Sequence, residues 1–276
     1  MKDGELMYKV NPYRPGAGTS PLYLAGREID ENEVNGIFEA LVNKVPVSSV
    51  IYSGLRGVGK TVLLNRFQRI AEEKSVFCKY IEVETRQDFI SQIVACSQAF
   101  LREVSSKEKI KNLLSKALDA LKTLVISFDV KNTTFTVSSQ ERELYTSTSL
   151  TQSLTDVFVY MGQTALEADT PICFFIDEIQ YMKQNELSAL IAALHRANQL
   201  GYPVMIIGAG LPKIYKMLSD EKSYSERLFM YKQIGSLSLE QSKKAIEEPA
   251  KKFKVEYTEE AMKDALRVIK NLFLQW

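Results

Sequence analysis

One glycine-rich segment constrains the fold of this chain more than any other feature. Residues 54–61 read Gly-Leu-Arg-Gly-Val-Gly-Lys-Thr and fit the pattern G-x-x-x-x-G-K-[ST]. An apolar, β-branched run at residues 47–53 precedes the segment and is typical of a buried strand. Apolar residues follow it at helical spacing, namely Val62, Leu63, Leu64, Phe67, Ile70 and Ala71. A strand, a glycine loop and a helix in this order predict a phosphate-binding loop rather than a chance turn.

The residues of this loop have distinct predicted roles. Its glycines let backbone N–H groups curl around phosphates, and the N-terminus of the following helix adds a partial positive charge. Lys60 is expected to reach the β- and γ-phosphates, and the Thr61 hydroxyl is expected to hold Mg²⁺. The predicted nucleotide contacts are Gly54, Gly57, Val58, Gly59, Lys60, Thr61 and Val62. Because no Asn-Lys-x-Asp guanine-recognition sequence occurs in the chain, we predict ATP rather than GTP.

The composition narrows the class of protein and its partners. The chain has 276 residues, of which 45% are hydrophobic and 25% charged, and this suits one sizeable core with a small second domain. A net charge of +1 creates no field that would attract nucleic acid or an anionic membrane. Two alternatives stay open for the basic C-terminal residues, a solvated face or a local nucleic-acid contact. These residues are Lys243, Lys244, Lys251 and Lys252.

The cysteine content and the N-terminus predict a cellular location. Cys78, Cys96 and Cys173 are well separated, and with one histidine in the chain they predict reduced thiols rather than a zinc site. Residues 1–5 lack an apolar signal region, and no run approaches the roughly eighteen apolar residues of a membrane span. We therefore expect a soluble, cytoplasmic protein without a membrane partner.

Apolar runs alternate with helical patterns along the rest of the chain. Further strands are predicted at residues 76–83, 171–176, 204–207 and 228–234. Helices are predicted at residues 29–42, 87–126, 150–168, 184–200 and beyond Ser238, which forms a capping box with Gln241. Alternating polar and apolar residues around Asn132 indicate a β-hairpin insertion. The alternation predicts an α/β fold, a three-layer sandwich with a parallel sheet between helices.

A carboxylate pair follows the apolar strand at residues 171–176. In phosphate-loop proteins such a strand tip lies beside the loop, because ligands bind at the carboxyl ends of parallel strands. Asp177 is then expected to bind Mg²⁺, and Glu178 to polarise the attacking water. The alternative is a helix-capping turn with no chemical role. The phosphate loop upstream favours the functional interpretation.

Six short motifs, in order along the chain, resemble those of AAA+ ATPases of the origin-recognition and initiator-loader branch and of the related STAND ATPases. In particular, the chain resembles bacterial and archaeal single-chain ATPases of that group. The matching segments are Gly26–Glu28, Gly54–Thr61, Phe175–Gln180, Ala192–Asn198, Gly208–Pro212 and Ser225–Phe229. Together they cover about residues 10–250, which makes the resemblance far more specific than the loop alone.

The resemblance implies a five-stranded core with the phosphate-loop strand at its centre. It also implies that Gly26 and Arg27 lie near the adenine and that Arg227 precedes the last core strand. An arginine at that place in the AAA+ group is supplied to the γ-phosphate of a neighbouring subunit. The alternative for Arg227 is a surface salt bridge with Glu221 or Glu226.

The C-terminal third departs from the family pattern at two places. The strand that ends near Gly208 carries no polar residue to sense a γ-phosphate, so the sequence identifies no residue for this role. The last helices resemble a shortened lid, and the winged-helix domain that usually follows is not expected, which disfavours DNA binding. We predict an N-terminal arm at residues 1–25, a core at residues 26–236 with an insertion at 87–148, and a partial helical lid at 237–276.

The predicted function is ATP binding with slow, Mg²⁺-dependent hydrolysis that drives a conformational or assembly switch. The first alternative is a nucleotide-gated module that binds DNA or a protein partner and hydrolyses ATP only when assembled, for example as a homo-oligomer. A metabolic kinase fits less well, since kinases rarely carry the Asp177-Glu178 strand tip. His195 is predicted to have a structural or surface role. Tyr13 and Tyr23 are predicted either to cover an adenine ring or to pack on their own domain.

Overall fold

The computed structural model describes residues 11–13, 21–84, 89–128, 130, 149–221 and 225–274, without the side chains of residues 225, 226 and 269–274. It divides into two compact units. Residues 34–234 form the sheet unit, and residues 1–33 with 235–276 form the terminal unit. The predicted β-hairpin around Asn132 lies outside the described residues.

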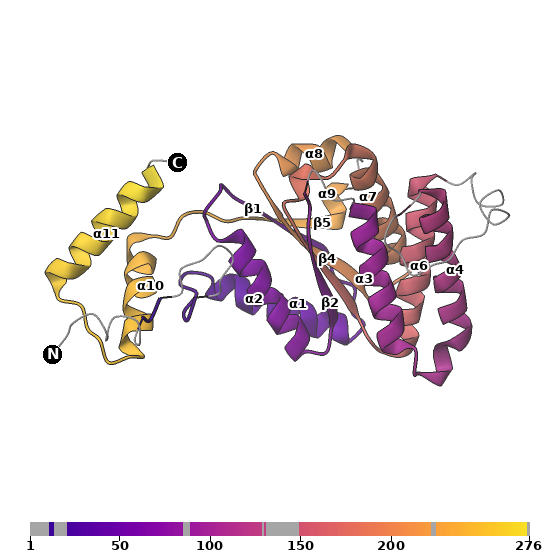
Figure 1. Ribbon diagram of the computed structural model, residues 1–276, viewed down its shortest axis with the longest axis horizontal. Helices are drawn as coiled ribbons and strands as arrows, with labels where there is room; N and C mark the ends of the chain where they lie inside the picture. The colour runs from indigo at the N-terminus through magenta and orange to yellow at the C-terminus, as the bar shows by residue number, and fades with distance from the viewer. Residues whose placement is uncertain are drawn as a thin grey trace. The chain divides into compact units, whose positions relative to one another are not determined.

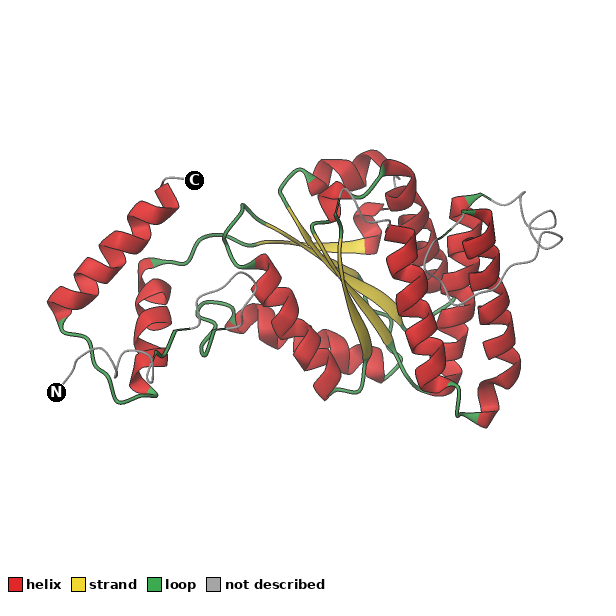
Figure 2. Ribbon diagram, in the orientation of Figure 1, coloured by secondary structure: helices red, strands yellow, loops and turns green. Residues whose placement is uncertain are grey.

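A five-stranded parallel sheet forms the centre of the sheet unit (Figure 2). The strands are β1 (Ser49–Ser53), β2 (Phe77–Glu82), β3 (Ile172–Asp177), β4 (Val204–Gly210) and β5 (Phe229–Gln233). Their order in the sheet is β2-β3-β4-β1-β5. The predicted α/β fold with five parallel strands is therefore confirmed. β1 is an interior strand between β4 and β5, one place from the middle strand β4.

The interior strands are buried and mainly apolar because helices cover both faces of the sheet. Every residue of β3 and β4 is buried. Phe175 of β3 contacts Phe38 in an edge-to-face arrangement, whereas its neighbour Phe174 packs against Phe158. Since successive side chains of a strand point to opposite faces, these two contacts define the two faces of the sheet.

Two helical layers enclose the sheet (Figure 1). The helices α1 (Glu28–Val42) and α2 (Lys60–Glu73) cover one face, where Phe67 of α2 also packs on Tyr52 of β1. The opposite face carries α3 (Phe89–Val104), α4 (Lys111–Ser127), α6 (Leu150–Ala168) and α7 (Gln184–Gln199). Together they form the predicted three-layer sandwich.

The region at residues 87–126, predicted to be helical, contains two helices with a break between them. α3 ends at Val104, a 3₁₀ turn spans Glu108–Ile110, and α4 starts at Lys111. The Ser105 hydroxyl donates a hydrogen bond of 2.7 Å to the carbonyl of Arg102 at this break. A serine that bonds to nearby backbone competes with the helical pattern, and this gives the physical reason for the interruption.

Shorter elements follow the strands of the sheet unit. A 3₁₀ turn at Ile179–Tyr181 follows β3, and α8 (Ile214–Glu221) and α9 (Ser225–Leu228) lie between β4 and β5. Among the residues described, no helix has both the length and the apolar composition to cross a membrane.

The terminal unit contains α10 (Leu239–Lys251) and α11 (Glu259–Leu274). The predicted capping box is present, since the backbone N–H groups of Ser238 and Gln241 each donate to the other's side chain. The hydroxyl of Tyr13 bonds to the Ile246 carbonyl and the Tyr257 hydroxyl within the same unit. The chain thus joins its N-terminal segment to its C-terminal helices.

Candidate nucleotide-binding site

The glycine loop begins where β1 leaves the sheet. The N–H of Gly54 donates to the carbonyl of Gly210 at 3.1 Å and so extends the pairing of β1 with β4. A Cβ atom on Gly54 would lie 2.5 Å from the carbonyl oxygen of Ile234, which leaves room for glycine only. Gly57 and Gly59 have φ angles of 81° and 91°, a backbone region that side chains disfavour. Local geometry therefore accounts for the glycines of the motif.

Lys60 opens α2 and folds back over the loop. Its ammonium group donates hydrogen bonds of 3.0 and 2.9 Å to the carbonyls of Gly54 and Leu55. Burial lowers the pKa of Lys60 below its ordinary value, while the carboxylates of Glu178 and Asp177 raise it. A buried cation is thus held in the curve of the loop, close to the carboxylates at the end of β3.

Thr61 and Asp177 meet although 116 positions separate them in the chain. The Thr61 hydroxyl donates to Oδ2 of Asp177 at 2.6 Å, and the Tyr80 hydroxyl donates to the same oxygen at 2.8 Å. Asp177 is 1% exposed, and its Oδ1 accepts the backbone N–H of Glu178 at 2.8 Å. Both oxygens of this buried carboxylate are therefore hydrogen-bonded, as a buried charge requires.

Glu178 sits at a turn between β3 and the following 3₁₀ helix. Its φ of 54° is unusual for a residue with a side chain, and such local strain is often found at functional sites. The side-chain amide of Gln180 donates to Oε2 of Glu178. Burial, with the nearby carboxylates of Asp177, Glu84 and Glu178, raises the pKa of Glu82 on the neighbouring strand. The carboxyl edge of the sheet thus concentrates negative charge beside the loop.

These residues suit a nucleotide with a hard divalent cation. The loop presents backbone N–H groups at a helix N-terminus, which favours phosphate. The Thr61 hydroxyl and the Asp177 carboxylate supply two hard oxygen donors 2.6 Å apart. Mg²⁺ commonly takes such a pair together with phosphate oxygens and water. The described residues contain no cluster of three or more His, Cys, Asp or Glu side chains that could hold a metal alone, and a Mg²⁺ site of this kind does not need one.

A protein-family model for the AAA ATPase domain matches residues 23–207, which include the loop and the Asp177-Glu178 strand tip. The chain belongs to the AAA ATPase domain family. The family resemblance derived from the sequence motifs is therefore confirmed. A search of curated proteins found no match.

The solved structure of Cdc6p shares the fold of this AAA ATPase domain, and two other solved structures are less similar to it. The Cdc6p structure from Pyrobaculum aerophilum is 14% identical with a TM-score of 0.52, over 87% of this chain and 53% of that one. Orc1 of Aeropyrum pernix, solved with DNA, is 16% identical with a TM-score of 0.45, over 84% and 51%. AMPPCP-bound DnaA of Aquifex aeolicus is 14% identical with a TM-score of 0.46, over 94% and 60%. The chain spans about half the length of the first two and about three fifths of the third.

The contacts described above do not include three of the predicted site residues, Gly26, Arg27 and Arg227. Gly26 and Arg27 belong to the terminal unit, where Arg27 donates to the carbonyl of Gly235 at 2.8 Å and a Cβ on Gly26 would touch Gln241. Arg227 is exposed on α9, directly before β5. The roles given to these residues remain predictions. His195 is half-buried on α7.

Sequence reasoning missed two polar side chains of the site, Tyr80 and Gln180. Tyr80 lies in β2 two residues before its end, and its contact with Asp177 depends on the register of β2 against β3. Gln180 stands two positions after Glu178 in the motif Phe175–Gln180. This position is the one feature of the sequence that could have indicated its place in the site. Arg56 of the loop donates to the Tyr181 hydroxyl at 2.9 Å. This bond joins the loop to the 3₁₀ turn that contains Gln180.

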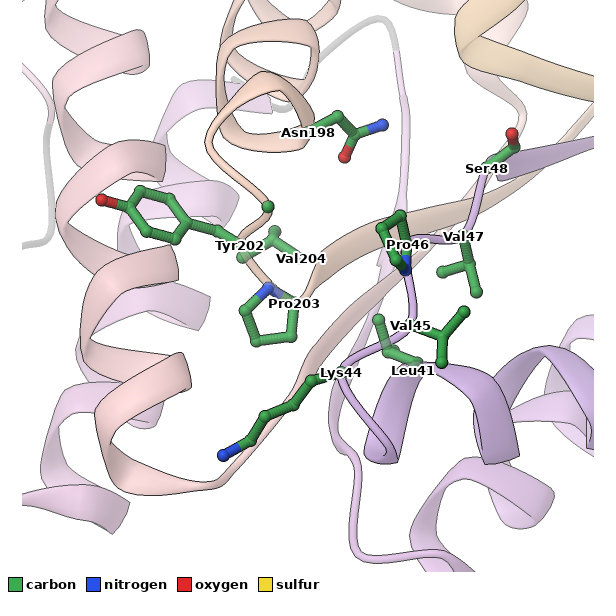
Figure 3. A pocket seen from close by; sticks show the side chains of 11 residues that line it. Leu41, Lys44, Val45, Pro46, Val47, Ser48, Asn198, Tyr202, Pro203 and Val204 are labelled. Atoms are coloured by element: carbon green, nitrogen blue, oxygen red, sulfur yellow. The ribbon is translucent and has the colours of Figure 1, made fainter.

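A cavity of about 190 Å³ lies at the opposite edge of the sheet, beside the amino ends of β1 and β4 (Figure 3). It is lined by Leu41, Lys44–Ser48, Asn198 and Gly201–Val204. Its charged residue, Lys44, forms an ion pair of 3.0 Å with Asp169. Since the phosphate loop follows the carboxyl end of β1, this cavity is not the nucleotide site.

Proposed function

We propose that this AAA ATPase domain binds ATP with Mg²⁺ and hydrolyses it slowly, as a conformational or assembly switch. The contact between Thr61 and Asp177 is the observation that carries the proposal. It joins the phosphate loop to the acidic strand tip, the two parts that this chemistry requires.

Each residue of the site has one task in the proposed reaction. The loop glycines and the N-terminus of α2 bind the phosphates, and Lys60 places a point charge against the β- and γ-phosphates. Thr61 and Asp177 would hold Mg²⁺, which would supply positive charge against the phosphates. Glu178 orients a water molecule for attack on the γ-phosphate and accepts its proton.

A second candidate function is favoured by the exposure of Arg227. An exposed guanidinium before the last core strand is available to the γ-phosphate of a neighbouring copy, where its charge would stabilise the transition state. In that case the chain hydrolyses ATP only when assembled and acts as a nucleotide-gated partner-binding module.

The test is phosphate release at saturating ATP and Mg²⁺ by the full chain over a range of protein concentrations. Glu178→Gln should bind ATP normally but hydrolyse it on the order of a hundredfold more slowly, because the amide cannot accept the proton of the water. Glu167→Gln, which changes an exposed carboxylate on α6, is the control and should behave like the wild type. Turnover per chain that rises steeply with concentration would favour the assembled enzyme.

Equal hydrolysis by the wild type and Glu178→Gln would contradict the proposed role of Glu178. Absence of turnover at every concentration would contradict the ATPase proposal as a whole.

A cytoplasmic location is part of this proposal. Its support is that all three cysteines, Cys78, Cys96 and Cys173, are free thiols, as proteins of reducing compartments usually have.

A further inference from the structure

Gln180 is a buried polar side chain whose amide oxygen and amide nitrogen both form hydrogen bonds. It is 4% exposed, in the 3₁₀ turn that follows Glu178. Its Oε1 accepts the backbone N–H of Leu211 at 2.9 Å, and its Nε2 donates to Oε2 of Glu178. One amide thus bridges the carboxylate beside the loop and the first residue after β4.

The chemistry of the partners determines the orientation of this amide. The Leu211 N–H can only donate, so the oxygen of Gln180 must face it and the nitrogen must face Glu178. An ionised carboxylate only accepts, so the nitrogen is the matching group at that end. At position 180, neither a carboxylate nor an apolar side chain could form hydrogen bonds with both the Leu211 N–H and the Glu178 carboxylate.

Gly210 makes room for this bridge at the end of β4. A Cβ atom on Gly210 would lie 2.6 Å from Oε1 of Gln180. The sequence of β4 ends in Gly208-Ala209-Gly210 and offers no polar side chain there. The glutamine therefore occupies the space that a side chain at position 210 would fill. The carbonyl of Gly210 also accepts the N–H of Gly54, so the same residue is tied to the phosphate loop.

We propose that Gln180 is a positioning residue that holds the Glu178 carboxylate in its productive orientation and links it to the end of β4. This inference rests on the proposed ATPase function. Because the amide bonds to both groups, a shift of the segment between β4 and α8 would move the Glu178 carboxylate that orients water. Misplacing a catalytic group by about 1 Å can slow a reaction by orders of magnitude, so the bridge should affect turnover rather than affinity.

The first experiment compares Gln180→Leu and Gln180→Glu with the wild type as full-length protein. Gln180→Leu removes both hydrogen bonds at similar volume. Gln180→Glu can still accept from Leu211 but places a second carboxylate against Glu178. Both variants should lower kcat about tenfold or more, whereas the dissociation constant for the non-hydrolysable analogue AMPPCP with Mg²⁺ should change less than about twofold.

A matched control uses a glutamine with the same kind of contact elsewhere. The amide of Gln152 donates to the Asp156 carboxylate at 2.8 Å on the surface of α6. Gln152→Leu should leave kcat unchanged, because that bond lies within α6 and involves neither the loop nor Glu178.

A second experiment tests the bridge without changing the glutamine. Gly210→Ala should push the Gln180 amide aside and lower kcat, because its new methyl group overlaps Oε1. In a Gln180→Ala background the same substitution should cause little further loss, since the space is then free. Such non-additivity is the signature of two residues acting through one contact.

Wild-type kcat in Gln180→Leu, or additive losses for Gly210→Ala and Gln180→Ala, would overturn this proposal while leaving the ATPase function intact. Weakened AMPPCP binding in parallel with kcat would also overturn it, because the role would then be structural. A wild-type chain that hydrolyses no ATP would overturn the proposed function, and this inference with it.

Discussion

At the scale of single residues, the site converges on Asp177. Its two oxygens accept three hydrogen bonds, from Thr61, Tyr80 and the backbone of Glu178. Burial raises the pKa of Tyr80, as does the nearby Asp177 carboxylate, so the phenol keeps its proton and acts as the donor. The hydroxyl from β2 is therefore a structural support for the predicted Mg²⁺ ligand.

The substitution Tyr80→Phe tests this support. It removes one donor to a buried carboxylate, and we expect the free energy of unfolding to fall by about 1.5–3 kcal/mol. Urea unfolding monitored by circular dichroism measures the change. Tyr160→Phe, at a partly buried tyrosine of α6, is the control. Unfolding midpoints that match the wild type for Tyr80→Phe would show that the Tyr80 hydroxyl contributes nothing to stability.

At the scale of elements, the phosphate loop combines two different demands for glycine. Gly59 lies in open space, and only its φ of 91° disfavours a side chain. Gly54 faces the backbone oxygen of Ile234 at the end of β5. The loop therefore needs glycine at position 59 for its backbone conformation, and at position 54 for the close approach to Ile234.

Alanine substitutions separate these two demands. Gly59→Ala should lower the free energy of unfolding by about 1–2 kcal/mol, the cost of a left-handed conformation. Gly54→Ala should cost more, since backbone must move. Gly36→Ala is the control, because Gly36 lies in α1 with open space around it and alanine favours helices by up to about 1 kcal/mol. Differential scanning calorimetry measures all three, and equal losses for Gly54→Ala and Gly59→Ala would refute the distinction.

The elements themselves were largely predictable from the sequence. A continuous apolar run forms β3, and a glycine motif precedes α2. Each of these sequence patterns is compatible with few structures other than the observed one. The break at Ser105 was missed, because apolar periodicity continues on both sides of it. The contacts of Tyr80 and Gln180 could not be predicted, since they depend on strand register and on the turn after β3.

At the scale of the whole molecule, the proposed role of Arg227 requires that several copies of the chain assemble. Arg227 is exposed before β5, where the family resemblance places an arginine that serves a neighbouring subunit. Mixing two inactive variants tests this role. Arg227→Ala retains the site, and Glu178→Gln retains the arginine, so their mixture should recover part of the hydrolysis.

Two observations accompany the mixing experiment. Arg102→Ala, at an exposed arginine of α3, should hydrolyse ATP like the wild type. Mass photometry with and without ATP and Mg²⁺ should show larger species when nucleotide is present. Full activity of Arg227→Ala alone, at concentrations where the chain assembles, would rule out the arginine finger.

We propose that the loop at residues 54–61 binds the phosphates of ATP through Lys60. Isothermal titration calorimetry of ATP with Mg²⁺ tests it most directly, on the wild type, on Lys60→Ala and on the exposed-surface control Lys216→Ala. We predict that Lys60→Ala loses at least about 2 kcal/mol of binding free energy, roughly thirtyfold in affinity, while the control is unchanged. Unchanged ATP affinity in a folded Lys60→Ala protein would contradict the account.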